Sequence, residues 1–172
     1  SNAARIAREG GGFLASSTEP IMIAQVQLVG VVDPYRAKIE ILSKKDDILK
    51  IANEQDPVLV SLGGGAKDIE VRVIDTELGK MVITHLLVDT KDVMGANVVN
   101  TMAEATAPRI KEIVGGGTVY LRIISNLAVY RLARARAVFP SHVLGGEDAV
   151  DGILYADAFA TADPFRCATH NK

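Results

Sequence analysis

The sequence predicts an α+β fold, in which an antiparallel β-sheet carries helices on one face. Two observations predict it. Short segments rich in β-branched or alternating apolar residues are interleaved with longer segments whose apolar residues recur at helical spacing. Breaks rich in proline and glycine separate these segments, in the order β-α-β-β-α-β of a ferredoxin-like unit. Because both crossovers are helical, we expect an antiparallel sheet with its helices together on one side.

The first strand and the first helix follow each other closely. Residues 21–32 are mostly β-branched and apolar, and the strand ends at Asp33-Pro34. Apolar residues then recur at helical spacing between charged ones over residues 37–52. Pro57 and the run Gly63-Gly64-Gly65 interrupt this helical pattern.

Three further strands complete the predicted sheet. Residues 68–74 alternate polar and apolar side chains, as a half-buried strand does. A turn-like segment separates them from residues 81–88, so these two strands should form a hairpin. The last strand is predicted over residues 118–124.

A long helix precedes this last strand. Asp92 is a candidate cap for a helix that runs to about Val114. The run Gly115-Gly116-Gly117 should end it, since glycine favours helix C-termini. The ferredoxin-like domain is therefore expected over residues 21–126.

The remaining segments are expected to be helical and to belong to another domain. Helices are predicted over residues 127–138 and 149–160. These pieces do not complete a second hydrophobic core. Residues 4–20 are therefore interpreted as a connection from a larger, mostly absent substrate domain, and residues 127–172 as a helical return into it. Ser1-Asn2-Ala3 is interpreted as the remnant of a cleaved expression tag.

Composition restricts the class of protein. The formal net charge is −2 over 172 residues, which gives no indication of nucleic-acid binding. Cys167 is the only cysteine, and this favours a reducing cytoplasm. No apolar run reaches the roughly 20 residues that span a bilayer, and no signal-peptide pattern is present. The histidines are too dispersed to indicate a metal site, so no metal and no membrane partner are expected.

The segment Asp92-Val93-Met94-Gly95-Ala96-Asn97 allows two interpretations. In the first, Asp92 caps a helix and Gly95 merely permits close packing. In the second, the exposed amides at a helix start, unobstructed at the glycine, receive the pyrophosphate of a dinucleotide. The segment taken alone favours the first interpretation.

Several other motifs surround this segment at characteristic spacing. They are Gly11-Gly12-Phe13, Ala24-Gln25-Val26-Gln27, Ser61-Leu62-Gly63-Gly64-Gly65, Asp68-Ile69-Glu70-Val71, Arg122-Ile123-Ile124-Ser125-Asn126-Leu127-Ala128 and Asp163-Pro164-Phe165-Arg166-Cys167-Ala168-Thr169-His170-Asn171-Lys172. Together they closely resemble class II (bacterial- or archaeal-type) 3-hydroxy-3-methylglutaryl-CoA (HMG-CoA) reductases over essentially the whole chain. That family usually has alanine where this chain has Val93. The resemblance identifies the chain as a large fragment of such a reductase, containing its whole non-Rossmann NAD(P)-binding domain.

The resemblance implies a nicotinamide-nucleotide site. Asp92, Met94, Gly95 and Asn97 match the family segment that contacts the cofactor. Asp56 matches an aspartate that, in NADH-preferring members, discriminates the adenosine ribose. Such a carboxylate accepts hydrogen bonds from a free 2′-hydroxyl but repels a 2′-phosphate, so NAD(H) is favoured and NADP(H) remains possible. The alternative for Asp56 is a cap or a solvated residue ahead of the following proline.

The resemblance also implies residues for the substrate. Lys172 matches the catalytic lysine, which would stabilise the oxyanion that develops when hydride reaches the thioester carbonyl. Arg166 matches an arginine that contacts the hydroxymethylglutaryl group, and its forked guanidinium suits a carboxylate. Asn126 and Asn171 match polar residues of the same site.

The family reaction reduces HMG-CoA to mevalonate and CoA with two hydrides from two nicotinamide cofactors. Its catalytic glutamate, aspartate and histidine fall outside this chain, so the fragment alone is expected to be inactive. The family builds its active site across a dimer interface, which implies a homodimer or a higher homo-oligomer. The alternative direction is the reverse reaction, which degrades mevalonate.

Two rival functions remain open. One is a non-enzymatic ferredoxin-like module that binds or senses a small metabolite, which the fold alone would permit. A regulatory module has no reason to carry Asp92, Gly95, Asn97, Arg166 and Lys172 together, and this set argues against it. The other is a different NAD(P)-dependent reductase of related architecture, against which the Thr-His-Asn-Lys ending argues.

The remaining candidates carry weaker signals. Residues 10–15 formally fit the Rossmann fingerprint, but no strand precedes them, so they are interpreted as a flexible connection. His85 is interpreted as a core or sheet-face histidine and Cys167 as a small buried residue. Three arginines are interpreted as a solvated helix face rather than as contacts to a CoA phosphate: Arg131, Arg134 and Arg136.

Overall fold

The computed structural model describes residues 2–170, and the chain divides into two compact units. One unit consists of residues 17–132. The other combines the described residues of 1–16 and 133–172. The domain predicted over residues 21–126 lies within the first unit.

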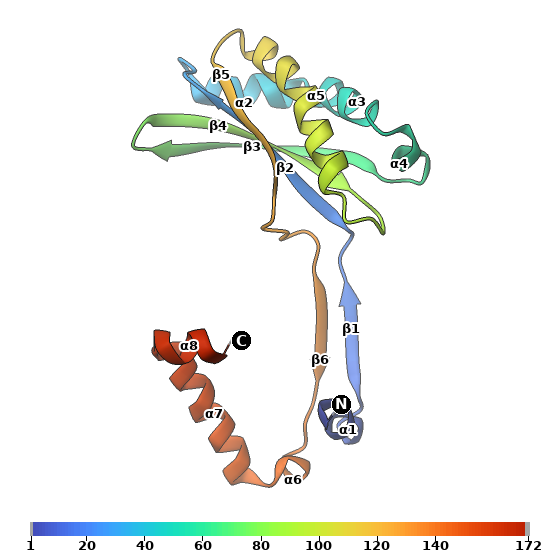
Figure 1. Ribbon diagram of the computed structural model, residues 1–172, viewed down its shortest axis with the longest axis vertical. Helices are drawn as coiled ribbons and strands as arrows, with labels where there is room; N and C mark the ends of the chain where they lie inside the picture. Colours follow the sequence, from blue (N-terminus) through green and yellow to red (C-terminus); the bar gives the residue numbers. More distant parts are fainter. Residues whose placement is uncertain (1, 171–172) are drawn as a thin grey trace. The chain divides into compact units, whose positions relative to one another are not determined.

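The unit of residues 17–132 is built on a four-stranded antiparallel sheet. Its strands are β2 (Ile21–Val29), β3 (Gly65–Thr76), β4 (Gly79–Asp89) and β5 (Thr118–Ser125). Their spatial order is β3-β4-β2-β5 (Figure 1). β3 and β4 form the predicted hairpin, with Thr76 opposite Gly79, and β2 pairs with both β4 and β5. The predicted succession of strands and helices and the antiparallel pairing are confirmed.

The helices of this unit lie together on one face of the sheet (Figure 1). They are α2 (Pro34–Ser43), α3 (Lys45–Asn53), α4 (Pro57–Ser61) and α5 (Ala96–Val114). The helical pattern predicted over residues 37–52 is present, but as two helices. The N–H of Lys44 donates to Ile41 O at 3.1 Å and ends α2 before α3 begins. The apolar spacing continues across Lys44, so the pattern does not show the break.

Helix α4 lies where the sequence predicts only an interruption. Proline lacks a backbone N–H, but the first residue of a helix needs no such donor. Pro57 therefore starts a helix, and the preceding Asp56 caps it by accepting a hydrogen bond from the Leu59 N–H at 2.9 Å. The capping interpretation of Asp56 is thereby confirmed.

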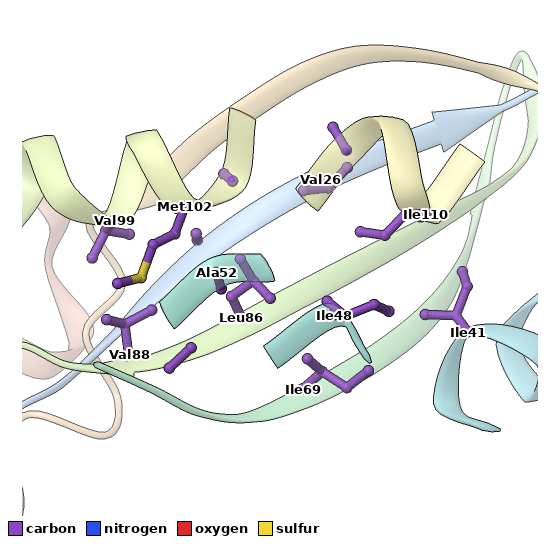
Figure 2. Close-up of a cluster of buried hydrophobic side chains, with 14 of the residues drawn as sticks. Val26, Ile41, Ile48, Ala52, Ile69, Leu86, Val88, Val99, Met102 and Ile110 are labelled. Atoms are coloured by element: carbon purple, nitrogen blue, oxygen red, sulfur yellow. The ribbon is translucent and has the colours of Figure 1, made fainter. Parts of the chain in front are cut away.

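The hydrophobic core lies between the sheet and the helices. Alternate residues of β2 face the helices and are buried: Met22, Ala24, Val26 and Leu28. Figure 2 shows Val26 and Leu86 from the sheet beside Ile48, Met102 and Ile110 from α3 and α5, all fully buried. Burying a side chain of this size contributes about 1.5–3 kcal/mol. The core therefore fixes the strand ends from which the loops of this unit emerge.

The ends of α5 differ in how well the sequence predicts them. The expected glycine C-cap is confirmed, since Gly115 has φ 70° and its N–H donates to the carbonyls of Lys111 and Glu112. The expected cap at Asp92 is wrong. The residue before the helix is Gly95, with φ 85°, and no described side chain caps it. Asp92 is exposed in a turn three residues earlier, because the chain must first turn sharply after β4.

The second unit contains a two-stranded ribbon and helices of 4 to 16 residues. Its elements are α1 (Asn2–Glu9), β1 (Phe13–Ser17), β6 (Ala133–Ala137), α6 (Ser141–Leu144), α7 (Glu147–Ala162) and α8 (Pro164–His170). β1 pairs with β6, and the rings of Phe13 and Phe139 meet edge to face at 6.3 Å. Helix α7 confirms the helix predicted over residues 149–160.

Two expectations for the segments that form the strands of this ribbon are wrong. The helix predicted over residues 127–138 is a turn followed by β6, because Ala-Arg-Ala-Arg-Ala has a period of two that suits a strand paired with β1. The flexible connection predicted over residues 10–15 is a turn followed by β1. Gly10 permits the ribbon to close here, since a Cβ would lie 1.9 Å from Val138 O. No helix among the described residues is long and apolar enough to cross a membrane.

Candidate functional site

A surface hollow of about 320 Å³ lies between α4 and the start of α5. It gathers residues from two segments that are distant in sequence but converge at one end of the sheet. The lining residues are Asp56, Val58, Leu59, Leu62, Val93, Met94, Gly95, Ala96, Asn97 and Val98. Four of the five residues predicted to bind the cofactor are therefore brought together here, and Asp92 is the one that does not line the hollow.

The start of α5 presents backbone amides at the hollow. The first hydrogen bond of this helix runs from the Val99 N–H to Gly95 O at 3.0 Å. The preceding amides of Ala96, Asn97 and Val98 have no acceptor within the helix, and the helix dipole makes this end positive. An anionic group is the ligand that such an arrangement favours.

Gly95 is required by both conformation and space. Its φ of 85° lies in the left-handed region that side chains disfavour. A Cβ on Gly95 would lie 2.4 Å from Cγ2 of Thr90, which is fully buried. Any larger residue would push the loop away from Thr90 and displace the start of α5.

The loop before Gly95 is tied to neighbouring strands. Thr90 donates to Pro20 O from its N–H at 3.1 Å and from Oγ1 at 3.3 Å, and its carbonyl accepts from the Val93 N–H at 3.2 Å. Lys91 has φ 52°, the one positive φ of a non-glycine residue in the described chain. Its ammonium contacts Asp89 Oδ2 at 2.9 Å, and its N–H donates to Asp89 Oδ1 at 2.9 Å. This buried carboxylate thus holds the loop in its unusual conformation.

The run of glycines after α4 lets that helix approach the end of β4. A Cβ on Gly64 would lie 2.6 Å from the Leu59 side chain and 2.8 Å from Asp89 O. A Cβ on Gly65 would lie 2.4 Å from Asn53 Oδ1, which accepts the Ala66 N–H at 2.7 Å. The glycines therefore permit the close packing that carries Asp56 to the hollow.

The remaining wall of the hollow is apolar. Val58 and Leu62 are each 69% exposed and Met94 is 74% exposed, although all three are large apolar side chains. Exposed apolar side chains gathered at a hollow are typical of a site for a ligand with an apolar ring. Backbone amides, one carboxylate and apolar walls together fit a nucleotide with a charged phosphate and a flat base.

The other predicted site residues lie elsewhere. Asn126 is exposed just after β5, in the same unit as the hollow. Arg166 is partly buried in α8, in the other unit. Asn171 and Lys172 lie outside the described residues.

The weaker candidates are settled individually. His85 is 7% exposed, and its Nε2 lies 3.0 Å from Gln25 Nε2, which confirms a sheet-face histidine. Cys167 is exposed on α8, so the prediction of a buried cysteine is wrong.

The expected arginine face on a helix is also wrong. Arg134 and Arg136 lie on strand β6. Arg131 lies in the turn before β6 and donates hydrogen bonds to the loop between β4 and α5. Sequence reasoning missed this contact, because no local pattern relates two segments that are 38 residues apart.

Comparison with known proteins gives concordant matches. Residues 1–172 match the family model described as hydroxymethylglutaryl-coenzyme A reductase. The chain is 64% identical over 172 residues to the 3-hydroxy-3-methylglutaryl-coenzyme A reductase of Archaeoglobus fulgidus, an alignment that covers 100% of this chain and 39% of that protein. The chain therefore spans well under half the length of this relative.

Solved structures of the corresponding protein from Streptococcus pneumoniae are also similar. One matches with a TM-score of 0.91 and 37% identity, covering 98% of this chain and 46% of that chain. Another, described as the class II 3-hydroxy-3-methylglutaryl-CoA reductase bound to NADPH in open conformations, matches with a TM-score of 0.89 and 37% identity, covering 98% of this chain and 42% of that chain.

Proposed function

This chain belongs to the hydroxymethylglutaryl-coenzyme A reductase family, and we propose that it supplies the nicotinamide-nucleotide site of an enzyme that reduces HMG-CoA to mevalonate and CoA. One observation carries the proposal. Asp56 and the segment from Met94 to Asn97 line one hollow, although nearly 40 residues separate them in the sequence. Each of the two nicotinamide cofactors used in a complete reaction would supply one hydride.

The domain assignment is a second part of this proposal. We assign residues 21–126 to a ferredoxin-like nucleotide-binding domain, which the strand order β3-β4-β2-β5 supports. Residues 4–20 and 127–172 are assigned to a larger substrate-binding domain. The family's dimeric active site makes a homodimer or higher homo-oligomer the expected assembly.

The start of α5 would hold the pyrophosphate of the cofactor. The backbone amides of Ala96 to Val98 and the positive end of the helix favour its negative charge. Gly95 keeps side-chain atoms away from the phosphate, and Asn97 can donate from its amide group. Met94 and Val98 provide apolar walls. Asp92, exposed in the preceding turn, would contact the cofactor from outside the hollow.

Asp56 would determine the preference between the two cofactors. One of its carboxylate oxygens caps α4, and a carboxylate has a second oxygen that can accept a hydrogen bond from a ribose 2′-hydroxyl. The same charge repels a 2′-phosphate. We therefore propose NAD(H) as the favoured cofactor, with NADP(H) binding more weakly. The Streptococcus pneumoniae relative is described as bound to NADPH, so the preference would differ between members.

Four residues are proposed for the substrate. Lys172 would place its ammonium at the thioester carbonyl and stabilise the oxyanion formed as hydride arrives. Arg166 would bind the carboxylate of the hydroxymethylglutaryl group through its forked guanidinium. Asn126 and Asn171 would contribute polar contacts at the same site.

The proposal is tested by binding and turnover. Calorimetry on the 172-residue chain should show NADH binding. A protein of the relatives' full length that carries this chain should oxidise NADH with HMG-CoA. Lys172→Ala should abolish turnover while nucleotide binding persists, and Lys50→Ala, at an exposed position of α3, should leave both unchanged. A folded, oligomeric protein that oxidises neither nucleotide would overturn the assignment and favour a binding module.

A further inference from the structure

We propose that Arg131 is a positioning residue for the nucleotide-binding loop. It would orient the N–H groups of Met94 and Gly95 as donors to the cofactor's pyrophosphate. This inference rests on the proposed function, because it concerns the same hollow at the start of α5.

Arg131 contacts the loop at three acceptors. Its Nη1 donates to Thr90 Oγ1 at 3.1 Å, to Val93 O at 3.2 Å and, more weakly, to Met94 O at 3.5 Å. Hydrogen bonds from a guanidinium are charge-assisted and stronger than those between neutral groups. One side chain thus binds both the base of the loop and its tip.

The contacts of Arg131 with two carbonyls also determine the direction of the neighbouring N–H groups. A trans peptide is planar, so its C=O and its N–H point in opposite directions. When Arg131 holds the carbonyls of Val93 and Met94, the N–H groups of Met94 and Gly95 must therefore point away from the guanidinium. Met94 and Gly95 both line the hollow.

These two amides are available to a ligand. Among residues 2–170, the Met94 and Gly95 N–H groups donate no hydrogen bond. Successive backbone N–H groups beside a left-handed residue form a concave donor site that suits an anion. Together with the first amides of α5, they would extend the donor set for a pyrophosphate.

Arg131 is itself firmly held. Thr18 Oγ1 donates to Tyr130 O at 2.9 Å and accepts from the Leu132 N–H at 2.8 Å. The Tyr130 hydroxyl donates to Glu70 Oε1 at 2.7 Å. The residues on either side of Arg131 are therefore anchored to β3 and to the segment before β2, so the guanidinium is presented from a fixed base.

The experiment compares NADH and ADP-ribose, both of which contain a pyrophosphate, by calorimetry on the 172-residue chain. Arg131→Ala should raise the dissociation constants of both ligands by about 10-fold or more. Millimolar guanidinium should restore much of the affinity, because it replaces the missing group. The affinity of Arg131→Lys should lie between those of the unaltered chain and Arg131→Ala, since an ammonium cannot reproduce the planar fork of a guanidinium. Arg134→Ala, on β6, is the matched control and should bind as the unaltered chain does.

The outcomes distinguish failure of the proposed nucleotide site from failure of the proposed role of Arg131. No binding of NADH by the folded, unaltered chain would overturn the proposed nucleotide site itself. Normal NADH binding that Arg131→Ala leaves unchanged would overturn only the role of Arg131. A loss of affinity that guanidinium does not restore, accompanied by an equal loss of stability to urea, would reduce Arg131 to a purely structural residue. If Arg131→Ala does not fold, Arg131→Lys decides: unchanged affinity for both ligands contradicts the inference and weaker affinity at unchanged stability supports it.

Discussion

The carboxylate of Asp56 accepts a hydrogen bond from the Leu59 N–H at 2.9 Å, and both residues line the hollow at the start of α5. One side chain therefore stabilises a short helix and contributes the only carboxylate among the residues that line this hollow. Replacing Asp56 changes both properties unless the new residue keeps the cap. Experiments on cofactor preference must separate the two effects.

Asp56→Asn should change cofactor preference without unfolding α4. Asparagine caps a helix about as well as aspartate, but it does not repel a 2′-phosphate. The ratio of the NADPH to the NADH dissociation constant should fall by about 10-fold. Calorimetry with both nucleotides measures this ratio. By contrast, Asp56→Ala should also lose about 1 kcal/mol of stability to urea.

Asp33→Asn is the matched control for this prediction. Asp33 caps α2 by accepting from the N–H groups of Tyr35 and Arg36, and it does not line the hollow. Its replacement should leave the nucleotide ratio unaltered. If Asp56→Asn and Asp33→Asn behave alike, Asp56 is only a cap.

Gly95→Ala should damage the start of α5. A non-glycine residue at φ 85° costs about 1–3 kcal/mol, and the Cβ would meet Thr90 Cγ2 at 2.4 Å. We expect lower stability to urea and loss of NADH binding. Gly152→Ala provides the contrast, because Gly152 lies inside α7 with no atom within 4 Å of a Cβ. That change should stabilise the helix by about 0.5–1 kcal/mol and preserve binding. Normal NADH affinity in Gly95→Ala contradicts the need for glycine here.

The Lys91–Asp89 contact should make the loop sensitive to acid. Burial of the Asp89 carboxyl raises its pKa, but hydrogen bonds from the Lys91 ammonium and N–H outweigh this, and the pKa lies below its ordinary value of 3.8. A lowered folded pKa contributes stability that is present above the ordinary value and is lost as the pH falls through the folded pKa. Urea unfolding from about pH 7 to about pH 3 should show this loss.

Lys91→Met should weaken this contribution. The unpaired Asp89 would then protonate at higher pH, so stability should begin to fall at a less acidic pH. Because the Lys91 side chain is 38% exposed and its charge is partly screened by water, the loss at neutral pH should be only about 1 kcal/mol. Lys50→Met, at an exposed position of α3, is the control and should leave the pH profile unchanged. Identical profiles for both variants would show that the Lys91 contact contributes nothing.

His85→Gln should remove a stability change between about pH 7 and about pH 5. Burial lowers the pKa of His85, the positive charge of Arg72 lowers it further, and Glu70 opposes both. The unfolded chain therefore binds a proton more readily, and the protein loses stability as the pH falls through the ordinary histidine range. Glutamine keeps a polar partner for Gln25 without titrating. Urea midpoints at both pH values test this, and an unchanged difference in His85→Gln excludes His85 as its source. His142→Gln, at a mostly exposed histidine of α6, is the control.

The sheet and α5 could be predicted because their signals are local. Alternating or β-branched apolar residues in β2, β3 and β4 determine which face is buried, and Gly115 ends α5 through its own backbone conformation. Strand β6 could not be recognised in the same way. Its Ala-Arg-Ala-Arg-Ala sequence alternates, but alanine is small and four of the five residues are exposed, so no buried face marks the strand. Its conformation depends on pairing with β1, more than 100 residues earlier.

The candidate site was predictable only in part. The helix start at Gly95 suggests an anion site from local chemistry, but that pattern equally suits a structural turn. The association of Asp56 with it came from resemblance to a family, since no spacing rule connects residues of α4 and α5. The packing that brings α4 and the start of α5 together depends on Gly64 and Gly65. In the sequence, the glycine run that contains them indicates only the end of a helix. The contact of Arg131 with Val93 was invisible for the same reason.

The N–H of Thr18 donates to Leu132 O at 2.9 Å, and the Leu132 N–H donates to Thr18 Oγ1 at 2.8 Å. The chain thus enters and leaves the unit of residues 17–132 through adjacent points. A segment whose ends meet can be excised or transplanted as a cassette, because joining its ends requires no rearrangement of its sheet. Residues 17–132 are therefore a natural module for grafting into a surface loop of an unrelated host protein, and for circular permutation at the exposed β3–β4 turn.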